Sequence, residues 1–536
     1  MTRWRGNPWA ILITLSLGFF MTLLDLTIVN IAIPSMTDKL HASLDEILWV
    51  TNAYTLVLAV LLITAGRLGD LLGKKNLFVA GVALFTLASL ACGISQDPTQ
   101  LIVARAVQGL GAAMLMPQTM SLIIATFPPE KRGAALGVWG GVAGISTIAG
   151  PTIGGLLVSA LDWRWIFFVN LPIGILVLVM ALPILPAHIK GARHRFDITG
   201  VVLASATLFC LVFGLTEGQK YNWAAWIWAL IGASVVLLAL FLVQQKMRQD
   251  RDPLMPFVLF ADRNFSILSA IGAIVSIGML GIFLPLTFYF QSAQGHSALE
   301  AGLIMAPSSI VSMFLAPLAG RLSDRVGGRF ILLGGLTLYG LGMLWVVLIA
   351  KTDTSWVAFM PPFVLAGIGI GGVFAPMATE ATRNVPPMLA GAASGVNNTI
   401  RQIGSVVGGA AVGALLQNQL ASSLRDEAVK RSAELPPQYR GQFVQGFANA
   451  GKGGLEVGTS QQTTAPPPGV PQAVAHKLQE LGGQVFTHGL VDAMKPTMLM
   501  PILLIFVGAA ACLGVKRYRA PEQQAAQSPE PASHKG

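Results

Sequence analysis

The sequence predicts an all-α polytopic membrane protein of fourteen transmembrane helices, built as two six-helix bundles with two further helices inserted between them. Three observations lead to this fold class. Only 11% of the 536 residues are charged while 54% are hydrophobic, and a water-soluble chain of this length could not cover its surface with so few charges. Fourteen apolar stretches have spanning length, and a charged turn recurs in the second half of the chain.

Each apolar stretch is about 20 residues long or longer, which is enough for a helix to cross the hydrocarbon core of a bilayer. In order, the predicted spans are 9–33, 46–66, 77–95, 100–125, 133–160, 164–186, 197–217, 224–245, 264–290, 300–320, 330–350, 356–379, 389–418 and 496–515.

Loops rich in lysine and arginine alternate along the chain with loops poor in them, and this alternation predicts how the chain is oriented in the membrane. The rich set holds Arg3, Arg5, Arg67, Lys74, Lys75, Lys131, Arg132, Lys190, Arg193, Arg195, Lys246, Arg248, Arg251, Arg263, Arg321, Arg325, Arg329, Arg383, Lys516, Arg517 and Arg519. The poor short loops hold only Lys39, Arg164, Lys220 and Lys351. Because cations concentrate in cytoplasmic loops, we expect a multi-pass protein of a bacterial-type plasma (inner) membrane with both termini cytoplasmic and an uncleaved first span.

The charged turn occurs twice, each time after a span and before the next. Residues 66–75 read GRLGDLLGKK after the second span, and residues 320–329 read GRLSDRVGGR after the tenth. If these two turns occupy equivalent positions, spans one to six correspond to spans nine to fourteen. Two parallel six-helix halves are a known transporter plan in which the substrate binds between the halves near the midplane.

The repeat predicts the domain organisation. Residues 1–190 would form the N-terminal six-helix bundle, residues 191–262 two inserted helices and a cytoplasmic linker, and residues 263–515 the C-terminal six-helix bundle. Within the C-terminal bundle, residues 419–495 would form an extracytoplasmic segment between spans thirteen and fourteen. We expect this segment to be helical at both ends and irregular in the middle. It would be either a surface hairpin or a lid over the outer mouth. We expect the tail, 516–536, to be disordered.

Asp25 lies about two thirds of the way along the first span. An ionisable side chain at membrane depth costs several kcal/mol unless it faces protein or water, so it marks a functional site. Arg105 lies about one turn into the fourth span and needs an acidic or carbonyl partner, and Asp25 is the acid clearly inside the first six spans. The alternative for Arg105 is a side chain that snorkels outward to backbone carbonyls.

The turn after span two predicts a breakable charge cluster on the cytoplasmic face. Its glycines allow helix ends to approach closely, and its carboxylate can accept hydrogen bonds from a helix N-terminus or an arginine. The residues of this conformational latch are Gly66, Arg67, Asp70, Gly73 and Lys74, with Asp324 and Arg325 in the second copy. The alternative is a simple turn with cationic anchors.

The fifth span is rich in glycine and contains a proline. Pro151 removes one helical hydrogen bond, and Gly144, Gly150, Gly154 and Gly155 permit close packing, so this helix can bend against a neighbour or serve only as a packing surface.

Four stretches in order resemble the major facilitator superfamily, and specifically its fourteen-span branch of drug:proton antiporters. They are the first-span stretch 24–34 (LDLTIVNIAIP), the turn at Gly66, the stretch from Arg105 to Gly109, and the stretch from Gly150 to Gly155. The resemblance covers residues 9–515. It departs at 327–329, where the second turn reads GGR instead of GKK.

The resemblance implies a mechanism and a substrate class. Asp25 would be the protonation site and Arg105 its charge partner, with protons as the coupling ion, no other cofactor and no metal. Small amphipathic or hydrophobic compounds would be exported by alternating access. The substrate contacts implied are Met21, Asn30, Trp49, Asn52, Tyr54, Gln108, Met114, Phe288, Tyr289, Phe374, Asn397, Asn398 and Arg401. Two further acids, Glu217 and Glu380, lie near span ends rather than at membrane depth.

Other classes fit the sequence less well. An ATP-driven pump needs a phosphate-binding glycine loop, which the chain lacks, and an enzyme needs a constellation that its seven histidines, in loops and the tail, do not form. Cys92, Cys210 and Cys512 fall inside spans, where free cysteines behave as small hydrophobic residues. A lipid or lipid-linked metabolite exporter, or a sensor of the same fold, stays open. We expect a monomer that contacts membrane lipids and binds no nucleic acid.

Overall fold

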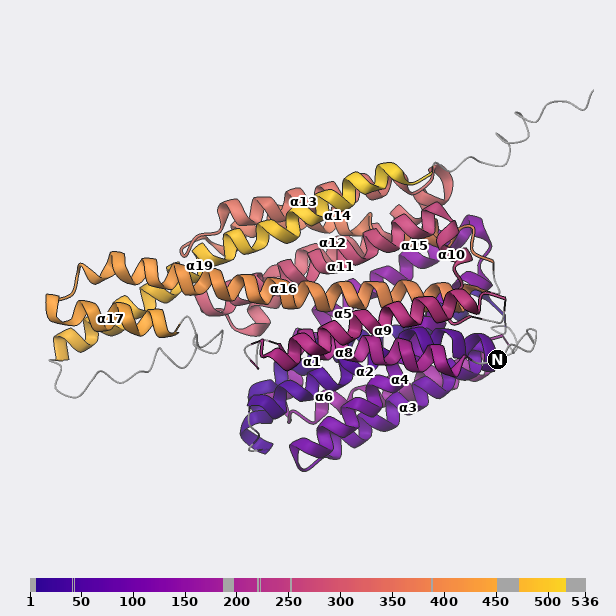
Figure 1. Cartoon of the computed structure of the whole chain (residues 1–536), viewed down its shortest axis with the longest axis horizontal. Coiled ribbons are helices and arrows are strands. Elements are labelled where there is room, and N and C mark those ends of the chain that lie inside the picture. The colour runs from indigo at the N-terminus through magenta and orange to yellow at the C-terminus, as the bar shows by residue number, and fades with distance from the viewer. Residues whose placement is uncertain are drawn as a thin grey trace, which may run out of the picture.

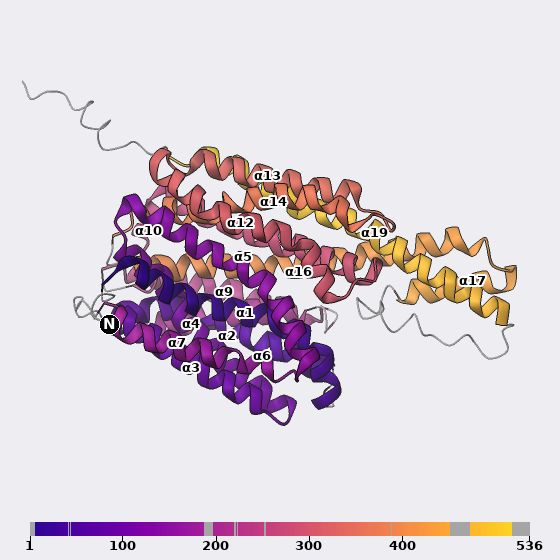
Figure 2. The same ribbon diagram turned by 180° about the vertical axis from the view of Figure 1, so that it is seen from behind.

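The computed structural model describes residues 6–40, 42, 44–186, 197–218, 221, 223–250, 253–386, 389–450 and 472–516. These residues form a bundle of long helices and contain no strand. In Figure 1 the helices of the first half, in indigo and purple, lie side by side on one side of the bundle, and those of the second half, in pink to yellow, lie on the other. Figure 2 shows the same division from behind.

The first half contains seven helices. They are α1 (Pro8–Leu40), α2 (Leu44–Leu72), α3 (Lys74–Ile94), α4 (Pro98–Thr126), α5 (Pro129–Ala160), the short α6 (Trp165–Phe168) and α7 (Asn170–Ile184).

The inserted pair and the second half follow in the same direction along the chain. The inserted helices are α8 (Ile198–Glu217) and α9 (Ala225–Met247), followed by the short α10 (Val258–Ala261). The second half has α11 (Arg263–Phe288) with a π-helical turn at Tyr289–Ala293, α12 (Ala298–Val326), α13 (Arg329–Ile349), α14 (Met360–Gly371), α15 (Phe374–Thr382), α16 (Ala390–Ser432), α17 (Pro437–Ala450) and α19 (Gln472–Ala511).

The helices that the structure describes account for all the predicted spans. Thirteen segments are long and apolar enough to cross a membrane, with α14 and α15 forming one of them, Trp356–Thr382. The remaining predicted span, 133–160, is α5, a 32-residue glycine-rich helix that packs along α1 and α12. The all-α polytopic fold class is therefore confirmed.

Both described ends of the chain lie at the same end of the bundle, which we call the terminal end. Trp9 at the start of α1 packs edge-on against Phe127 after α4, and the Lys516 amide after α19 donates to Asn264 Oδ1 at the start of α11 at 2.9 Å. The opposite end, from which α17 projects, is the hairpin end (Figure 1).

Helix starts are specified locally by side chains that accept hydrogen bonds from the first-turn amides. Asp97 caps α4 through the Gln100 amide at 2.9 Å, and Asp262 caps α11 through the Phe265 amide at 2.8 Å. Ser297 and Glu300 form a reciprocal capping box at the start of α12. These caps fix where the spans begin.

The segment between spans thirteen and fourteen is helical at both ends, as predicted. These helical ends are continuous with the spans: α16 and α19 run unbroken past the predicted span limits at 418 and 496 and pack together beyond the other helices (Figure 1). Leu416, Leu420 and Leu424 recur every four residues on α16 and pack with Val485 and Leu490 of α19, which buries one apolar stripe. The predicted irregular middle, 451–471, and the tail beyond Lys516 lie outside the described residues.

The inserted helices are joined at the terminal end by one buried carboxylate. Asp197 Oδ1 accepts from the Gly200 amide at the start of α8 at 2.9 Å, and the Asp197 oxygens also accept from Gln244, Gln245 and Arg248 at the end of α9. Burial raises the pKa of this carboxyl, but these hydrogen bonds and the Arg248 charge outweigh burial and hold the pKa below its ordinary value.

We expect Asp197→Ala to weaken the packing of α8 on α9, because it removes the cap and leaves the amide donors of Gln244 and Gln245 without their acceptor. The cost should be about 1–3 kcal/mol, seen as a lower midpoint of thermal unfolding. Because the folded pKa lies below the unfolded one, this stabilisation is present above the unfolded pKa and disappears as the pH falls through the folded pKa. The exposed Asp250→Ala is the control, and an equal loss in both variants would contradict the assignment.

Candidate functional site

A fully buried ion pair lies inside the first half. Arg105 Nη1 of α4 donates to Asp25 Oδ2 of α1, and neither side chain is exposed, at 0% each. The two residues are 80 positions apart in sequence, and the packing of α1 against α4 brings them together. A buried charge needs a partner and filled hydrogen-bonding positions to be tolerated at this depth, and each residue supplies them for the other.

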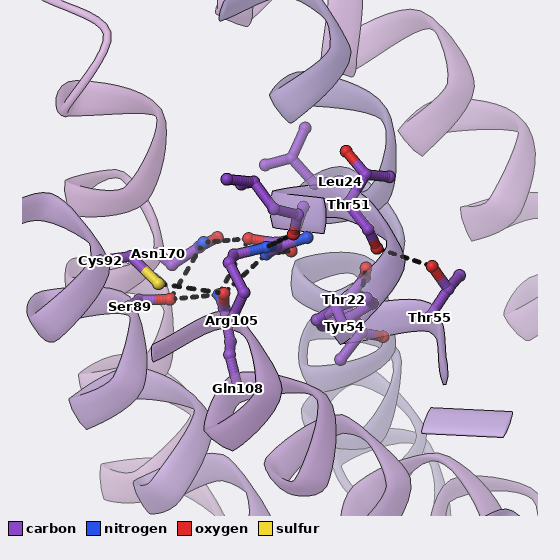
Figure 3. A network of polar contacts seen from close by, with 12 residues as sticks. Thr22, Leu24, Thr51, Tyr54, Thr55, Ser89, Cys92, Arg105, Gln108 and Asn170 are labelled. Carbon is purple, nitrogen blue, oxygen red and sulfur yellow. Dashed lines mark hydrogen bonds and ion pairs between the residues drawn. The ribbon is translucent and has the colours of Figure 1, made fainter. Parts of the chain in front are cut away.

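Three neutral polar residues complete the surroundings of the Asp25 carboxylate. Asp25 Oδ1 accepts from Gln108 Nε2 of α4 at 2.9 Å and from Asn170 Nδ2 of α7 at 3.2 Å. Ser89 Oγ of α3 accepts from the same two amide groups, at 2.6 Å from Gln108 and 3.3 Å from Asn170. Figure 3 shows Arg105, Gln108, Ser89 and Asn170 converging from three helices. Both oxygens of the Asp25 carboxylate therefore accept hydrogen bonds from the protein.

Arg105 is held from its other sides by backbone and rings. Its Nε donates to the Val50 carbonyl of α2 at 3.0 Å, and its guanidinium lies over the Tyr54 ring at 4.4 Å from the ring centre. Its Nη1 also donates to Gln108 Oε1 at 2.6 Å. The predicted alternative of outward snorkelling is wrong for this conformation, because the side chain points inward to Asp25.

The glycine-rich helix α5 lies against α1 next to this ion pair. A Cβ at Gly150 would stand 2.1 Å from Thr27 Oγ1, and one at Gly154 would stand 2.8 Å from the Ile28 side chain. Thr27 Oγ1 also donates to the Ser146 carbonyl of α5 at 3.2 Å. Gly155 faces open space, with nothing within 4 Å. Gly144 and Pro151 lie in α5, and their surroundings are outside the described side chains.

The first predicted latch carboxylate bridges the two halves at the terminal end. Asp70 Oδ2, near the end of α2, accepts from the Ala392 amide in the first turn of α16 at 3.1 Å. Lys74 Nζ lies 3.7 Å from Asp70 Oδ1. Gly66 allows the approach, since a Cβ there would stand 2.8 Å from the Gly391 carbonyl oxygen. A carboxylate at a helix N-terminus is favourable because it meets unpaired amides and the positive end of the dipole.

The second copy of the turn makes the equivalent bridge, from the second half to the first. Asp324 of α12 accepts from the Gly133 amide at 2.8 Å and from the Ala134 amide at 3.1 Å, both early in α5. Gly133 and Gly320 touch backbone to backbone. Each half thus places one carboxylate on a helix start of the other half.

The remaining latch residues have separate positions. Gly73 has φ +97°, a conformation that favours glycine, and ends α2 sharply before α3. Arg67 is buried, whereas Arg325 is exposed. Lys75, outside the predicted set, donates to the Leu182 and Leu185 carbonyls at the end of α7 at 2.6 and 3.0 Å.

Several residues predicted to contact substrate are enclosed in this conformation. Met21 belongs to the apolar core of the first half, Tyr54 lies beneath Arg105, and Gln108 is occupied by Asp25, all with 0% exposure. Tyr289, also buried, donates its hydroxyl to the Lys351 carbonyl at 2.6 Å near the hairpin end, and Phe288 packs against the α16–α19 cluster there. Four of these five are fully buried and Phe288 is half-buried in this conformation, and their contact with substrate stays a prediction.

The other predicted contacts lie elsewhere in the bundle. Asn52 donates to Glu217 of α8 at 3.2 Å, and Trp49 packs near Phe213 of α8. Asn397 is buried and donates to Ser269 of α11 at 3.4 Å, and Asn398 donates to the Ser394 carbonyl at 2.9 Å. Met114 lies beside Gly81 of α3, and the side chain of Asn30 is outside those described.

Arg401 and Phe374 form one pair among the predicted contacts. The Arg401 guanidinium lies over the Phe374 ring, 5.0 Å from its centre.

Asn170, which donates to Asp25, and Ser89, which accepts from Asn170 and Gln108 beside it, are not among the predicted site residues. A polar side chain in an apolar span was the available signal, but Ser and Asn in membrane helices also bond their own backbone, so position alone does not select them. Glu380 is one of the two acids predicted to lie near span ends. It is buried and accepts from the Gly328 amide at 2.5 Å and from Arg383 at 3.0 Å, so it is a structural group at the terminal end.

Comparisons with known proteins agree on one family. Residues 15–409 match the Major Facilitator Superfamily. The chain is 42% identical over 421 residues to an uncharacterised MFS-type transporter of Mycobacterium tuberculosis, covering 78% of this chain and 72% of that one. It is 34% identical over 535 residues to the tetracenomycin C resistance and export protein of Streptomyces glaucescens, covering 99% of this chain and 96% of the relative. The multidrug resistance protein Stp of Mycobacterium tuberculosis is 35% identical over 415 residues, with 77% and 76% covered.

Among solved structures, the human organic anion transporter MFSD10 (TETRAN) superposes with a TM-score of 0.59 over 93% of this chain and 99% of that one. The two sequences are 12% identical, so this likeness shows the shared fold alone.

The close approach of α5 to α1 predicts a contrast between two glycines on one helix. Gly150→Ala should lower the free energy of unfolding by about 1–3 kcal/mol, because the new methyl group overlaps Thr27. Gly155→Ala should not lower it, since that position is open and alanine favours the helix. Thermal unfolding of both purified variants measures the difference. Equal losses would show that α5 does not pack on α1 in this way.

Proposed function

Because the chain belongs to the major facilitator superfamily, we propose that it is a proton-coupled antiporter that exports small amphipathic or hydrophobic compounds by alternating access. It is a multi-pass membrane transporter and not an enzyme. Two relatives, a tetracenomycin C resistance and export protein and a multidrug resistance protein, support export of drug-like compounds as its task. The observation that carries the coupling part of the proposal is the buried ion pair between Asp25 and Arg105.

The ion pair ties proton binding to a movement of helices. Protonating Asp25 would leave the Arg105 charge buried without its counter-charge, which costs several kcal/mol in a low-dielectric interior. The cost disappears when α1 moves relative to α4, so that Asp25 reaches water or Arg105 finds another partner. Glycines of α5 pack on α1 at Thr27, two residues after Asp25. A movement of α1 would therefore be passed to α5, and from α5 to α12, which packs along it.

The described conformation supplies one end state of the cycle. The halves are joined at the terminal end by Asp70 and Asp324, and there the loops carry Lys74, Lys75, Arg321 and Arg325. The positive-inside rule supports the assignment of this end to the cytoplasm and of both termini to that side of the plasma membrane. The transporter is then closed towards the cytoplasm, with the latch holding and Asp25 ionised.

Exchange follows from these two elements. A proton taken up from outside neutralises Asp25, and the loss of the ion pair favours the state in which the latch is broken and the cytoplasmic side opens. In that open state the proton leaves Asp25 for the cytoplasm and the substrate binds from the cytoplasm. The restored ion pair then favours closure of the cytoplasmic side, and the substrate leaves to the outside. The inward-directed proton gradient thereby drives export, with protons as the sole coupling ion in this proposal.

We expect Asp25→Asn to fold and to bind substrate but to lose uphill, gradient-driven export. Asparagine keeps the shape of the side chain and most hydrogen bonds yet cannot carry a proton. Efflux from energised everted vesicles should fall to background, and substrate-induced proton release from the purified protein should vanish. Asp353→Asn, in an exposed loop at the hairpin end, is the control. Uphill export by Asp25→Asn would refute the coupling role.

Vesicles also separate this proposal from its closest rival. An antiporter moves small amphipathic compounds in proportion to the proton gradient, whereas a lipid exporter flips labelled phospholipid and leaves such compounds in place. Growth of a pump-deficient host against a compound panel, with wild type and Asp25→Asn compared, identifies the cargo.

The latch predicts a shift of the conformational equilibrium in Asp324→Ala. Removing the carboxylate exposes the unpaired amides of α5, at a cost of about 1 kcal/mol, or roughly a fivefold change in population. The measurement is the alkylation rate of Ser394→Cys, buried where α16 meets the Pro117 carbonyl of α4, in a variant without native cysteines. The rate should rise about fivefold in Asp324→Ala, and further when Asp70→Ala is added.

The matched control is Arg321→Ala, which removes an exposed charge three positions earlier on α12. Unchanged labelling in Asp324→Ala would mean that the contact with α5 does not hold the halves together.

A further inference from the structure

Arg401 is a membrane-depth arginine whose charge is not compensated by the described part of the chain. Within the described residues it forms no ion pair and no hydrogen bond, and its Nε is a buried donor without an acceptor. The side chain as a whole keeps partial exposure. An arginine is always charged, and leaving it unpaired inside a membrane protein costs several kcal/mol. A missing acceptor is therefore expected at its guanidinium.

Three other arginines of the described chain have acceptors for part of the guanidinium. Arg105 has Asp25 and the Val50 carbonyl, Arg383 has Glu380, and Arg132 donates to the Phe127 carbonyl at 3.1 Å. Arg329 also has a buried Nε without an acceptor, but it lies at the start of α13, at the terminal end. Arg401 differs from Arg105 in having no acidic partner at membrane depth among the residues described.

The neighbours of Arg401 fix its direction. Its stem lies on Gly272 of α11, where a Cβ would stand 3.2 Å from Arg401 Cγ. Its guanidinium lies over Phe374, at the start of α15. Phe374 in turn faces the first half, since its Cβ lies 3.6 Å from where a Cβ at Gly140 of α5 would stand. The pair thus lies inside the protein, where α15 of the second half meets α5 of the first and α16 packs on α11, and does not face lipid.

The pair also lies at mid-membrane depth. At about 1.5 Å per residue, Arg401, Gly272, Phe374 and Gly140 are all roughly 12–17 Å from the terminal ends of their helices. Trp139, next to Gly140, has a second buried donor without an acceptor, Nε1, at the same level. This is the depth and the interface at which transporters built of two parallel halves bind substrate.

We propose that Arg401 and Phe374 form a subsite for an aromatic organic anion, so that the exported compounds include amphipathic aromatic acids. A carboxylate, sulfonate or phenolate would accept the free guanidinium hydrogen bonds, and an aromatic ring would stack on the Phe374–Arg401 pair. Because Asp25 is already neutralised by Arg105, it does not balance this charge. The subsite therefore selects against organic cations, which would meet an uncompensated positive charge. The inference rests on the proposed export function and names its substrate class.

A series of three fluorescent compounds tests the charge preference. 9-Anthracenecarboxylate, its neutral carboxamide and the 9-anthracenylmethyl ammonium ion share one ring system and differ in charge. Binding to the full-length protein in phosphatidylcholine nanodiscs is measured by fluorescence, with empty discs subtracted. The wild type should bind the carboxylate roughly tenfold more tightly than the amide, and the ammonium ion least tightly. Equal binding of all three, binding of none, or preference for the cation would overturn the proposal.

Variants assign the preference to the guanidinium. Arg401→Gln should weaken carboxylate binding by roughly 10- to 100-fold and leave amide binding nearly unchanged, and Arg401→Lys should restore part of the loss. Arg425→Gln, which removes an exposed charge at the hairpin end, is the control for net charge. Unchanged carboxylate affinity in a folded Arg401→Gln would overturn the proposal. If that variant does not fold, the wild-type series alone decides.

A phosphate headgroup could offer the same anionic chemistry. Repeating the titration in discs that contain phosphatidylglycerol distinguishes the two sources. Equal carboxylate affinity in both kinds of disc assigns the subsite to a soluble anion, and a marked loss assigns it to lipid phosphate and overturns the proposal. Binding is measured without a proton gradient, so a failure of proton coupling would appear in the vesicle assay and leave this result intact.

Discussion

The structure depends on the ion pair between Asp25 and Arg105. An isolated charge in the interior of a membrane bundle is too costly to keep, so the two residues are buried together and hydrogen-bonded to their neighbours. Gln108 and Asn170 donate to Asp25, and the Val50 carbonyl accepts from Arg105. Ser89 of α3 accepts in turn from Gln108 and Asn170. The pair and its neighbours thereby join α1 to α2, α3, α4 and α7. In the proposed mechanism, loss of the Asp25 charge would change the packing of this first half.

A second constraint is that the two halves meet through glycine. At the terminal end, α2 approaches α16 at Gly66 and α5 approaches α12 at Gly133, and a Cβ at either place would overlap backbone atoms. Direct backbone contact leaves each carboxylate of the repeated turn in reach of the other half's helix start. The interaction is weak, of the order of 1 kcal/mol per cap, and this suits a contact that must break in every cycle. A strong ion pair at the same place would hold one state permanently.

The two arginines at membrane depth show how the chain separates coupling from recognition. Arg105 has all its acceptors from the protein, and its charge is cancelled inside the first half. Arg401 belongs to the second half and has an aromatic ring and a glycine as its neighbours, with no acceptor among the described residues. A compensated charge can respond to a proton, whereas an uncompensated one is available to a ligand. In the proposed mechanism this division would place the proton site and the anion subsite in different halves, which would move relative to each other.

The sequence by itself determined the fold class, the spans and the two carboxylate turns, because hydrocarbon imposes a fixed length and near-complete apolarity on each crossing helix. It also identified Asp25 and Arg105, since charges at membrane depth are rare enough to stand out. It did not determine that α16 and α19 run on past the bundle, since both continuations are too polar to register as spans. Nor did it separate Ser89 and Asn170 from other polar residues, show that Gln108 donates to Asp25, or show that Tyr54 and Met21 are enclosed. Only the tertiary structure decided these points, because partners such as Asp25 and Asn170, 145 residues apart, meet through the packing of distant helices that no local pattern records.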